Sequence, residues 1–208
     1  LFLDYDGTLT PIVRDPAKAD LSLRMRGRLE MLLKAGKCRI AVISGRSLED
    51  IRRRVGIHGI MYGGNHGLEV EGPEENLRYP VPEKSRRALD EVRRILARDL
   101  SAIPGAALEE KGLTLTVHLR NVKNDMLLIA VHTISEAIRP YRTHGEIVVR
   151  PGKKAFEIRP SVDWEKGKTV LWLLERSAAA GREPPWPLYV GDDRTDEDAF
   201  KTLQSFGI

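Results

Sequence analysis

The sequence predicts an α/β fold in which a smaller α+β domain interrupts a parallel-sheet core. Short apolar runs alternate with helical patterns over residues 1–71, and after Pro160 the same alternation returns. Between them lie a long amphipathic helix and a strand whose side chains alternate with period two. A chain of 208 residues is long enough for such an interrupted domain. We therefore expect a discontinuous core, residues 1–80 and 161–208, around an inserted domain, residues 81–160.

The core begins with a buried strand at Leu1–Leu3, because an apolar run ends abruptly at Asp4. A helix over Ser22–Ala35 follows, with leucines at helical spacing and a glycine after its last residue. The patterns then continue as Arg39–Ile43 (strand), Leu48–Val55 (helix), Gly59–Tyr62 (strand) and Leu68–Glu71 (an arm of a small hairpin). Strand and helix in alternation are typical of a parallel sheet with crossover helices.

The inserted domain follows a linker at Tyr79–Pro82 and begins with an amphipathic helix over Glu83–Leu100. Its other predicted elements are Leu113–Leu119 (a half-exposed antiparallel strand), Asp125–Ile138 (helix), and Glu146–Arg150 and Ala155–Arg159 (short strands around a turn at Gly152). The core then resumes with Glu165–Glu175 (helix), Leu188–Val190 (strand) and Asp196–Leu203 (helix). This mixture of elements distinguishes the insert from the core on either side.

Composition excludes several classes of function. No apolar run approaches the roughly 20 residues of a membrane helix, and the lone Cys38 permits neither an internal disulfide nor a cysteine zinc site. The net charge of +4 suits an anionic small molecule, whereas 6% aromatic residues and no nucleic-acid-binding motif disfavour a nucleic-acid partner. Gly167-Lys168-Thr169 is not part of a nucleotide-binding P-loop, because position 162 is valine where that motif needs glycine.

Two carboxylates follow the first predicted strand directly. Asp4 and Asp6 are two residues apart, and Gly7 allows the sharp turn that exposes backbone N–H groups to a ligand. Ligands of α/β sheets bind in the crevice at the carboxyl ends of the strands. One carboxylate can there attack phosphorus while the other transfers protons.

A second acidic cluster, Gly191–Asp198, follows the last predicted strand. Hard oxygen ligands at this density favour Mg²⁺. Glu197 and Asp198 also have a structural explanation, because acidic residues in the first turn stabilise the N-terminus of a helix. Asp192 is the first acid after its strand, so we expect it to face the same crevice as Asp4.

Two further positions suit phosphate binding. Ser44 follows the strand Arg39–Ile43, where a hydroxyl and a backbone N–H can hold a phosphate oxygen, although by itself the residue is more typical of an N-cap. Lys166 or Lys168, near the start of the next helix, could neutralise the charge of phosphate and carboxylates.

These motifs, in this order and on these elements, resemble the four motifs of the haloacid dehalogenase (HAD) superfamily of phosphatases. Further segments narrow the resemblance to the trehalose-6-phosphate phosphatase family: Leu3–Ile12, Ser44–Arg46, Asn65–Gly67, Glu109 with Lys111, His118 with Arg120, Glu157–Pro160, Lys166–Gly167 and Gly191–Phe200. The resemblance spans nearly the whole chain. It implies a Rossmann-like HAD core with an inserted α+β cap of the C2 type.

The resemblance also implies roles for the core residues. Asp4 is the implied nucleophile that forms an aspartyl-phosphate, and Asp6 the acid that protonates the leaving sugar and then activates water. Mg²⁺ is expected at the Asp4 carboxylate, the Asp6 carbonyl and Asp192. Ser44 and Lys166 are expected to hold the phosphoryl oxygens. Asp193 and Asp196 have two possible roles. They either bind the metal directly or hold the residues that bind it.

The implied substrate-binding residues are Arg46, Glu109, Lys111, His118 and Glu157. The last four lie in the expected cap, so we expect the cap to close over the core, with hinges near Tyr79–Pro82 and Arg159–Val162. The resemblance implies a cytoplasmic, monomeric, Mg²⁺-dependent phosphoric monoester hydrolase of trehalose biosynthesis that acts on trehalose 6-phosphate, without nucleic-acid or membrane partners.

Two alternative functions stay open. One is another HAD sugar-phosphate phosphatase, of the sucrose-phosphate or mannosyl-glycerate-phosphate type. The other is a non-catalytic sugar-phosphate-sensing domain of a larger synthase, although Asp4, Asp6 and Asp192 are all present. Members of the family usually carry a further strand and helix after the last motif, so we expect a C-terminally truncated chain.

Overall fold

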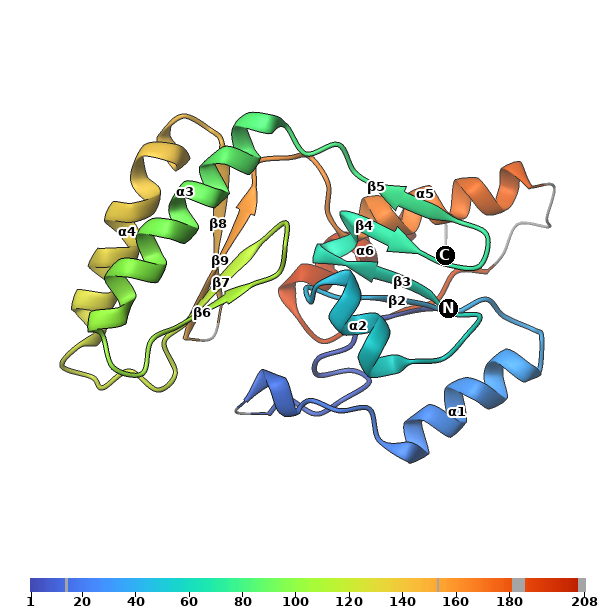
Figure 1. Ribbon diagram of the computed structural model, residues 1–208. Helices are drawn as coiled ribbons and strands as arrows, with labels where there is room; N and C mark the ends of the chain where they lie inside the picture. Colours follow the sequence, from blue (N-terminus) through green and yellow to red (C-terminus); the bar gives the residue numbers. More distant parts are fainter. Residues whose placement is uncertain (14, 153, 181–185, 206–208) are drawn as a thin grey trace. The chain divides into compact units, whose positions relative to one another are not determined.

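The computed structural model describes residues 1–13, 15–152, 154–180 and 186–205, and the chain forms two compact units (Figure 1). Unit 1 comprises Leu1–Tyr79 with Trp164–Ile208, and unit 2 comprises Pro80–Asp163. None of the helices in the described ranges has both the length and the apolar character needed to cross a membrane.

Unit 1 is built on a six-stranded sheet in the order β10-β1-β2-β3-β4-β5. Its strands are β1 (Phe2–Leu3), β2 (Ala41–Ile43), β3 (Met61–Gly64), β4 (Glu69–Glu71), β5 (Asn76–Arg78) and β10 (Tyr189–Val190). The four strands β10, β1, β2 and β3 are parallel, whereas β4 and β5 continue the sheet as an antiparallel hairpin. The carboxyl ends of the parallel strands therefore meet at one edge of the sheet.

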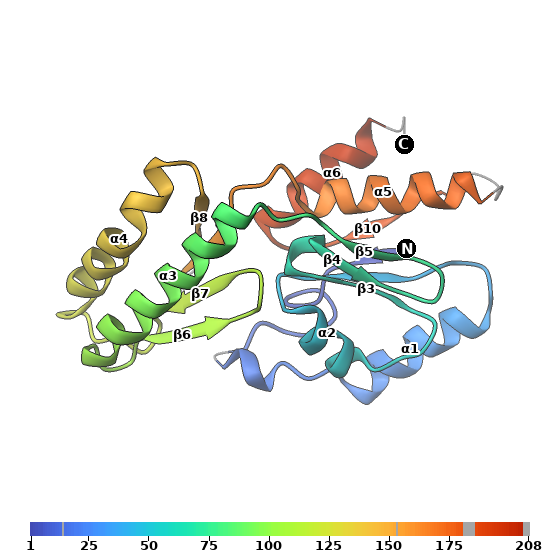
Figure 2. The same cartoon turned by 45° about the horizontal axis from the view of Figure 1, so that its top comes forward.

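Helices cover both faces of this sheet, as Figure 2 shows. The helices are α1 (Leu23–Lys34), α2 (Leu48–Val55), α5 (Lys166–Ala179) and α6 (Glu197–Gln204). Because side chains of a strand alternate between faces, Leu3 packs with the residues of α1 and α2, and Phe2 with those of α5 and α6. Doubly covered strands of this kind explain the uninterrupted apolar runs of the core.

Unit 2 is a four-stranded antiparallel sheet in the order β6-β7-β9-β8, with two helices on one face (Figure 1). Its elements are α3 (Glu83–Asp99), β6 (Ala107–Glu110), β7 (Leu115–His118), α4 (Leu127–Thr143), β8 (Ile147–Gly152) and β9 (Ala155–Pro160). Leu115, Val117 and Ile158 pack into one core with α3 and α4. Their neighbours along the strands therefore point to the opposite face.

Four short 3-10 helices complete the described elements: Pro16–Lys18, Asn65–Gly67, Leu100–Ala102 and Arg194–Asp196. The last of these precedes α6, so the helix predicted from Asp196 begins with a tighter turn. Part of the predicted turn after Gly152 falls on residue 153, which lies outside the described residues.

The structure corrects the expected exposure of β7. Its residues Leu115, Thr116 and Val117 are all buried, so the strand is not half-exposed. Leu115 and Val117 pack into the core with α3 and α4, and on the other face Thr116 is flanked in register by Glu109 and Glu157. The short strand β6 was not predicted, because its four residues Ala-Leu-Glu-Glu lack β-branched side chains.

Helix α4 also differs, since it continues beyond Ile138 through Pro140 to Thr143. A proline normally ends a helix by removing one N–H donor. The Thr143 hydroxyl donates to the Arg139 carbonyl at 2.9 Å, which helps to satisfy the last turn. The predicted strand at Gly59–Tyr62 is shifted to Met61–Gly64.

Candidate active site

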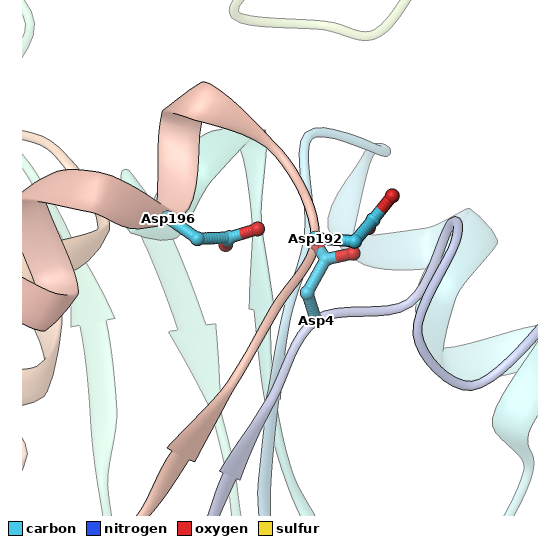
Figure 3. A group of neighbouring side chains, drawn as sticks. All are labelled: Asp4, Asp192 and Asp196. Carbon is cyan, nitrogen blue, oxygen red and sulfur yellow. The ribbon is translucent and has the colours of Figure 1, made fainter.

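Three aspartates meet at the carboxyl edge of the unit 1 sheet (Figure 3). Asp4 follows β1, Asp192 follows β10, and Asp196 ends the short turn before α6. One carboxylate oxygen of each lies within 4.8 Å of the others. Asp4 and Asp192 come together because their strands are hydrogen-bonded neighbours.

Lys166 supplies the positive charge of this cluster. Its Nζ donates to Asp4 Oδ1 at 2.6 Å and to Asp196 Oδ1 at 2.7 Å, and all three side chains are buried. Burial raises the pKa of Asp4 to about 6, and Lys166 offsets only part of that rise. Burial alone would lower the pKa of Lys166, but the two aspartates raise it, so the ammonium stays charged. Of the two candidate lysines, Lys166 is the one that contacts these aspartates, and Lys168 is exposed on the same helix.

The donor set fits a hard divalent cation. The pKa of Asp192 is raised by burial and by the charges of Asp196 and Asp193. Gly7 has a φ of +98° and lies so close that a Cβ there would collide with the Asp192 carboxylate. Only glycine therefore permits this approach. Several carboxylates with one lysine leave excess negative charge, and carboxylate oxygens are the ligands that Mg²⁺ prefers.

Asp6 does not join this cluster of three. Its carboxylate accepts two hydrogen bonds from Arg46, Nε to Oδ2 at 2.7 Å and Nη2 to Oδ1 at 2.6 Å. Arg46 is 6% exposed, donates to Asp50 as well, and lies over the Tyr5 ring. Arg46, predicted to contact substrate, is thus occupied by acids of its own unit.

Asp50 is the anchor of this arginine. It accepts hydrogen bonds from Arg46, Arg53 and Arg54. Burial alone would raise the pKa of Asp50, but the hydrogen bonds from Arg54, Arg53 and Arg46 lower it to about 2. A lowered carboxyl pKa stabilises the fold above the unfolded value near 3.8, and this contribution is lost as pH falls toward 2.

Asp50→Asn is therefore expected to cost roughly 1–2 kcal/mol of unfolding free energy at pH 7, after allowance for solvent screening. The difference from the unmodified protein should shrink as pH falls from about 4 toward 2. Urea unfolding across this range measures it, with the exposed Asp90→Asn as control. A difference of equal size at every pH would contradict the assigned cause.

Ser44 lies at the same edge of the sheet, directly after β2. It is 1% exposed, and its Oγ accepts a hydrogen bond from the Arg46 N–H at 3.2 Å. Its own N–H donates to the Gly63 carbonyl, and its carbonyl accepts from the His66 N–H. The hydroxyl oxygen thus caps its own turn. A hydroxyl can accept one hydrogen bond and donate another, so this contact does not exclude donation to a phosphate oxygen.

The two acids whose role was open behave differently. Asp196 is fully buried within the cluster, whereas Asp193 is exposed, caps the next turn and accepts from the Arg194 N–H. Asp198, predicted as a helix-start acid, accepts from the Gly167 N–H at 2.7 Å. Of the pair, Asp196 is the one close to Asp4.

The other predicted substrate residues gather on the helix-free face of the unit 2 sheet. Glu109 of β6 and Glu157 of β9 flank Thr116 of β7 in register. His118 Nε2 lies 2.7 Å from Glu109 Oε2, and Lys111 Nζ lies 3.9 Å from the same oxygen. Unit 2 therefore carries charged donors and acceptors of both signs on one polar face.

Sequence reasoning missed two members of the site. Tyr189 donates its hydroxyl to Asp196 Oδ1 at 2.6 Å, although its position suggested only an apolar strand residue. Asp50 was not singled out, because an acid in the first turn of a helix is common. The sequence feature that could have indicated this role is the position of Tyr189, two residues before the acidic segment Gly191–Asp198.

Comparison with known proteins agrees with this geometry. The sequence profile of the family described as Trehalose-phosphatase matches residues 2–207. The trehalose-phosphate phosphatase of Mycobacterium tuberculosis is 39% identical over 215 residues, covering 100% of this chain and 52% of that protein. A probable trehalose-phosphate phosphatase 4 of Oryza sativa subsp. japonica is 37% identical, covering 100% of the chain and 56% of its own length. The chain thus spans about half the length of these curated relatives.

Solved structures show the same architecture. The trehalose-6-phosphate phosphatase C-terminal domain of C. albicans superimposes with a TM-score of 0.80 at 28% identity, covering 99% of this chain and 73% of that one. A haloacid dehalogenase-like hydrolase from Bacteroides thetaiotaomicron, at 17% identity and a TM-score of 0.66, shares the fold, covering 97% and 84%. The predicted fold class, an α/β HAD core with an α+β insert, is confirmed. The chain belongs to the trehalose-phosphatase family.

Proposed function

We propose that the chain is a Mg²⁺-dependent phosphatase that hydrolyses trehalose 6-phosphate through an aspartyl-phosphate on Asp4. The observation that carries the proposal is the buried Lys166 Nζ, which lies 2.6 Å from Asp4 Oδ1 at the strand edge where Asp192 also lies. A lysine there orients the carboxylate and can neutralise an incoming phosphoryl group. Family membership and the names of the relatives support the choice of substrate.

In this mechanism an Asp4 oxygen forms a bond to phosphorus while the bond from phosphorus to the sugar oxygen breaks. Asp6 gives that oxygen a proton, and then takes one from the water that attacks the aspartyl-phosphate. Asp6 must leave Arg46 and take up a proton from water before it can donate to the leaving oxygen, because a carboxylate held by a guanidinium is acceptor-only. Ser44 and Lys166 hold the phosphoryl oxygens. Asp4, Asp192 and the Asp6 carbonyl would hold Mg²⁺, whose charge would balance that of the phosphoryl group.

Phosphate release from a panel of sugar phosphates tests the proposal. Trehalose 6-phosphate is expected to be turned over faster than sucrose 6-phosphate or mannosyl-glycerate phosphate. Excess chelator should stop the reaction and added Mg²⁺ should restore it. Full activity in chelator, or a faster reaction with another member of the panel, would contradict the metal or the substrate assignment respectively.

The polar face of unit 2 carries sugar recognition in this proposal. Glu109→Ala and Glu157→Ala each remove an acceptor for sugar hydroxyls, at roughly 1–3 kcal/mol per bond. The expected loss in kcat/KM for trehalose 6-phosphate is about tenfold to a hundredfold, with p-nitrophenyl phosphate nearly unaffected. Glu110→Ala is the matched control, because Glu110 follows Glu109 and points to the other face of β6. Equal losses on both substrates would mean that these residues support folding.

A cytoplasmic, monomeric enzyme without nucleic-acid or membrane partners belongs to the same proposal. The modest net charge of +4 and the 6% aromatic residues support the lack of a nucleic-acid partner, and the single cysteine is compatible with a reducing compartment.

A further inference from the structure

The Asp196 carboxylate accepts hydrogen bonds from three donors in three parts of the chain. Its Oδ1 accepts from Lys166 Nζ at 2.7 Å and from the Tyr189 hydroxyl at 2.6 Å, and its Oδ2 accepts from the Asp193 N–H at 3.0 Å. Asp196 is fully buried and Tyr189 is 7% exposed. The phenol is thus the one neutral side-chain donor among the described partners of this carboxylate.

The Tyr189 ring has little freedom to follow a carboxylate that moves. It lies among the apolar residues between the sheet and α5, and it meets the Phe200 ring edge-on, with centroids 5.5 Å apart and an interplanar angle of 89°. Burial, with Asp196 nearby, raises the pKa of Tyr189, so the hydroxyl keeps its proton and stays a donor. The hydroxyl therefore marks a fixed position for Asp196 Oδ1.

This position matters because Lys166 is shared. Its Nζ lies 2.6 Å from Asp4 Oδ1 and 2.7 Å from Asp196 Oδ1, almost midway between two acids. Without the phenol, Asp196 Oδ1 would have Lys166 as its remaining side-chain donor and would attract the ammonium more strongly. The lysine would then move away from Asp4, where the phosphoryl group is expected to bind.

We propose that Tyr189 is a positioning residue of the phosphoryl site: by donating to Asp196 it keeps the Lys166 ammonium shared with Asp4. The proposal rests on the proposed function for the role of Asp4. It assigns Tyr189 no contact with substrate, only the placement of the cation that meets the phosphate.

Tyr189→Phe tests the proposal, with Tyr62→Phe as matched control. Tyr62 is likewise a buried tyrosine of the same sheet. Its hydroxyl donates to the Ile57 carbonyl at 2.6 Å and not to an acidic side chain. Binding of inorganic phosphate is measured by calorimetry at saturating Mg²⁺ and well below Tm. We expect the Kd for phosphate to rise about tenfold in Tyr189→Phe and to stay unchanged in Tyr62→Phe.

Kinetics give a second readout. In Tyr189→Phe, kcat/KM should fall by a similar factor for trehalose 6-phosphate and for p-nitrophenyl phosphate, because both place a phosphoryl group beside Lys166. In an Asp196→Asn background the phenol has no carboxylate charge to compensate. The added effect of Tyr189→Phe on phosphate affinity should then largely disappear.

Two results would overturn the proposal. Unchanged phosphate affinity in folded Tyr189→Phe would make the hydroxyl merely structural. A higher Mg²⁺ requirement with unchanged phosphate affinity would mean that Tyr189 acts on the metal and not on Lys166. Phosphate binding needs no turnover, so a wild-type chain that binds phosphate without hydrolysing sugar phosphates would contradict the proposed function, and the binding comparison would still decide the role of Tyr189.

Discussion

Asp4→Asn is expected to lower phosphatase turnover at least about a thousandfold while making the metal-free protein more stable. Activity disappears because an amide cannot attack phosphorus. Stability rises because the pKa of Asp4 is raised from 3.8 to about 6, mainly by burial. A raised carboxyl pKa gives stability that is fully present below about pH 4 and is lost as pH rises through about 6. At about 1.4 kcal/mol per pKa unit, a neutral side chain recovers roughly 2–3 kcal/mol at pH 7.

Thermal unfolding in chelator at pH 7 measures the stability difference, which corresponds to a rise in Tm of about 4–10 °C. Repeating it at pH 4 should show little difference, because Asp4 itself is then protonated. The exposed Asp90→Asn serves as control. Near wild-type hydrolysis of trehalose 6-phosphate by Asp4→Asn would show that the nucleophile is another group.

Lys166→Met has the second largest expected effect, because it removes both activity and stability. It leaves Asp4 and Asp196 buried without their cation, and an uncompensated buried charge typically costs about 3–5 kcal/mol. Phosphatase turnover should fall by about a hundredfold or more, since no ammonium remains to meet the phosphoryl group. Lys168→Met, an exposed position on the same helix, should change neither by much.

A second substitution separates the two effects. In Lys166→Met with Asp196→Asn, one of the two stranded charges is gone, so urea unfolding should show that much of the lost stability returns. Activity should stay low, because the cation is still missing. A Lys166→Met protein as stable as Lys168→Met would mean that the buried aspartates are compensated by something else.

Features of the site that depend on neighbouring residues could be predicted from the sequence, whereas contacts between residues far apart in the sequence could not. The ends of the strands were predictable, because the apolar run Leu1–Leu3 ends at Asp4 and the apolar run before Gly191 is followed by Asp192. Pairing of Lys166 with Asp4 joins residues 162 positions apart, and no local pattern fixes such a contact. The resemblance to a family, and not periodicity, placed Lys166 beside the nucleophile.

Arg46 and Tyr189 show the limits most clearly. An arginine after a strand looks like an anion ligand, and only the fold shows that Asp6 and Asp50 occupy it. A tyrosine in a two-residue strand looks like core, and its ring is indeed packed there, while its hydroxyl reaches Asp196. Residues with an apolar body and a polar tip carry two roles, and hydropathy reports only the first.

Pairing of β1 with β10 has a consequence for synthesis on the ribosome. Phe2 pairs with Tyr189, which lies far behind it in the sequence, so β1 leaves the ribosome long before β10 does. Unit 2 is continuous in sequence, Pro80–Asp163, so all of its elements have left the exit tunnel while β1 is paired with β2 but still lacks β10, its neighbour on the other side. Contacts of such long range are the slow ones in folding. We therefore expect the inserted unit to fold first, and the nascent chain to remain unable to bind phosphate until the segment with Asp192 and Asp196 has been translated.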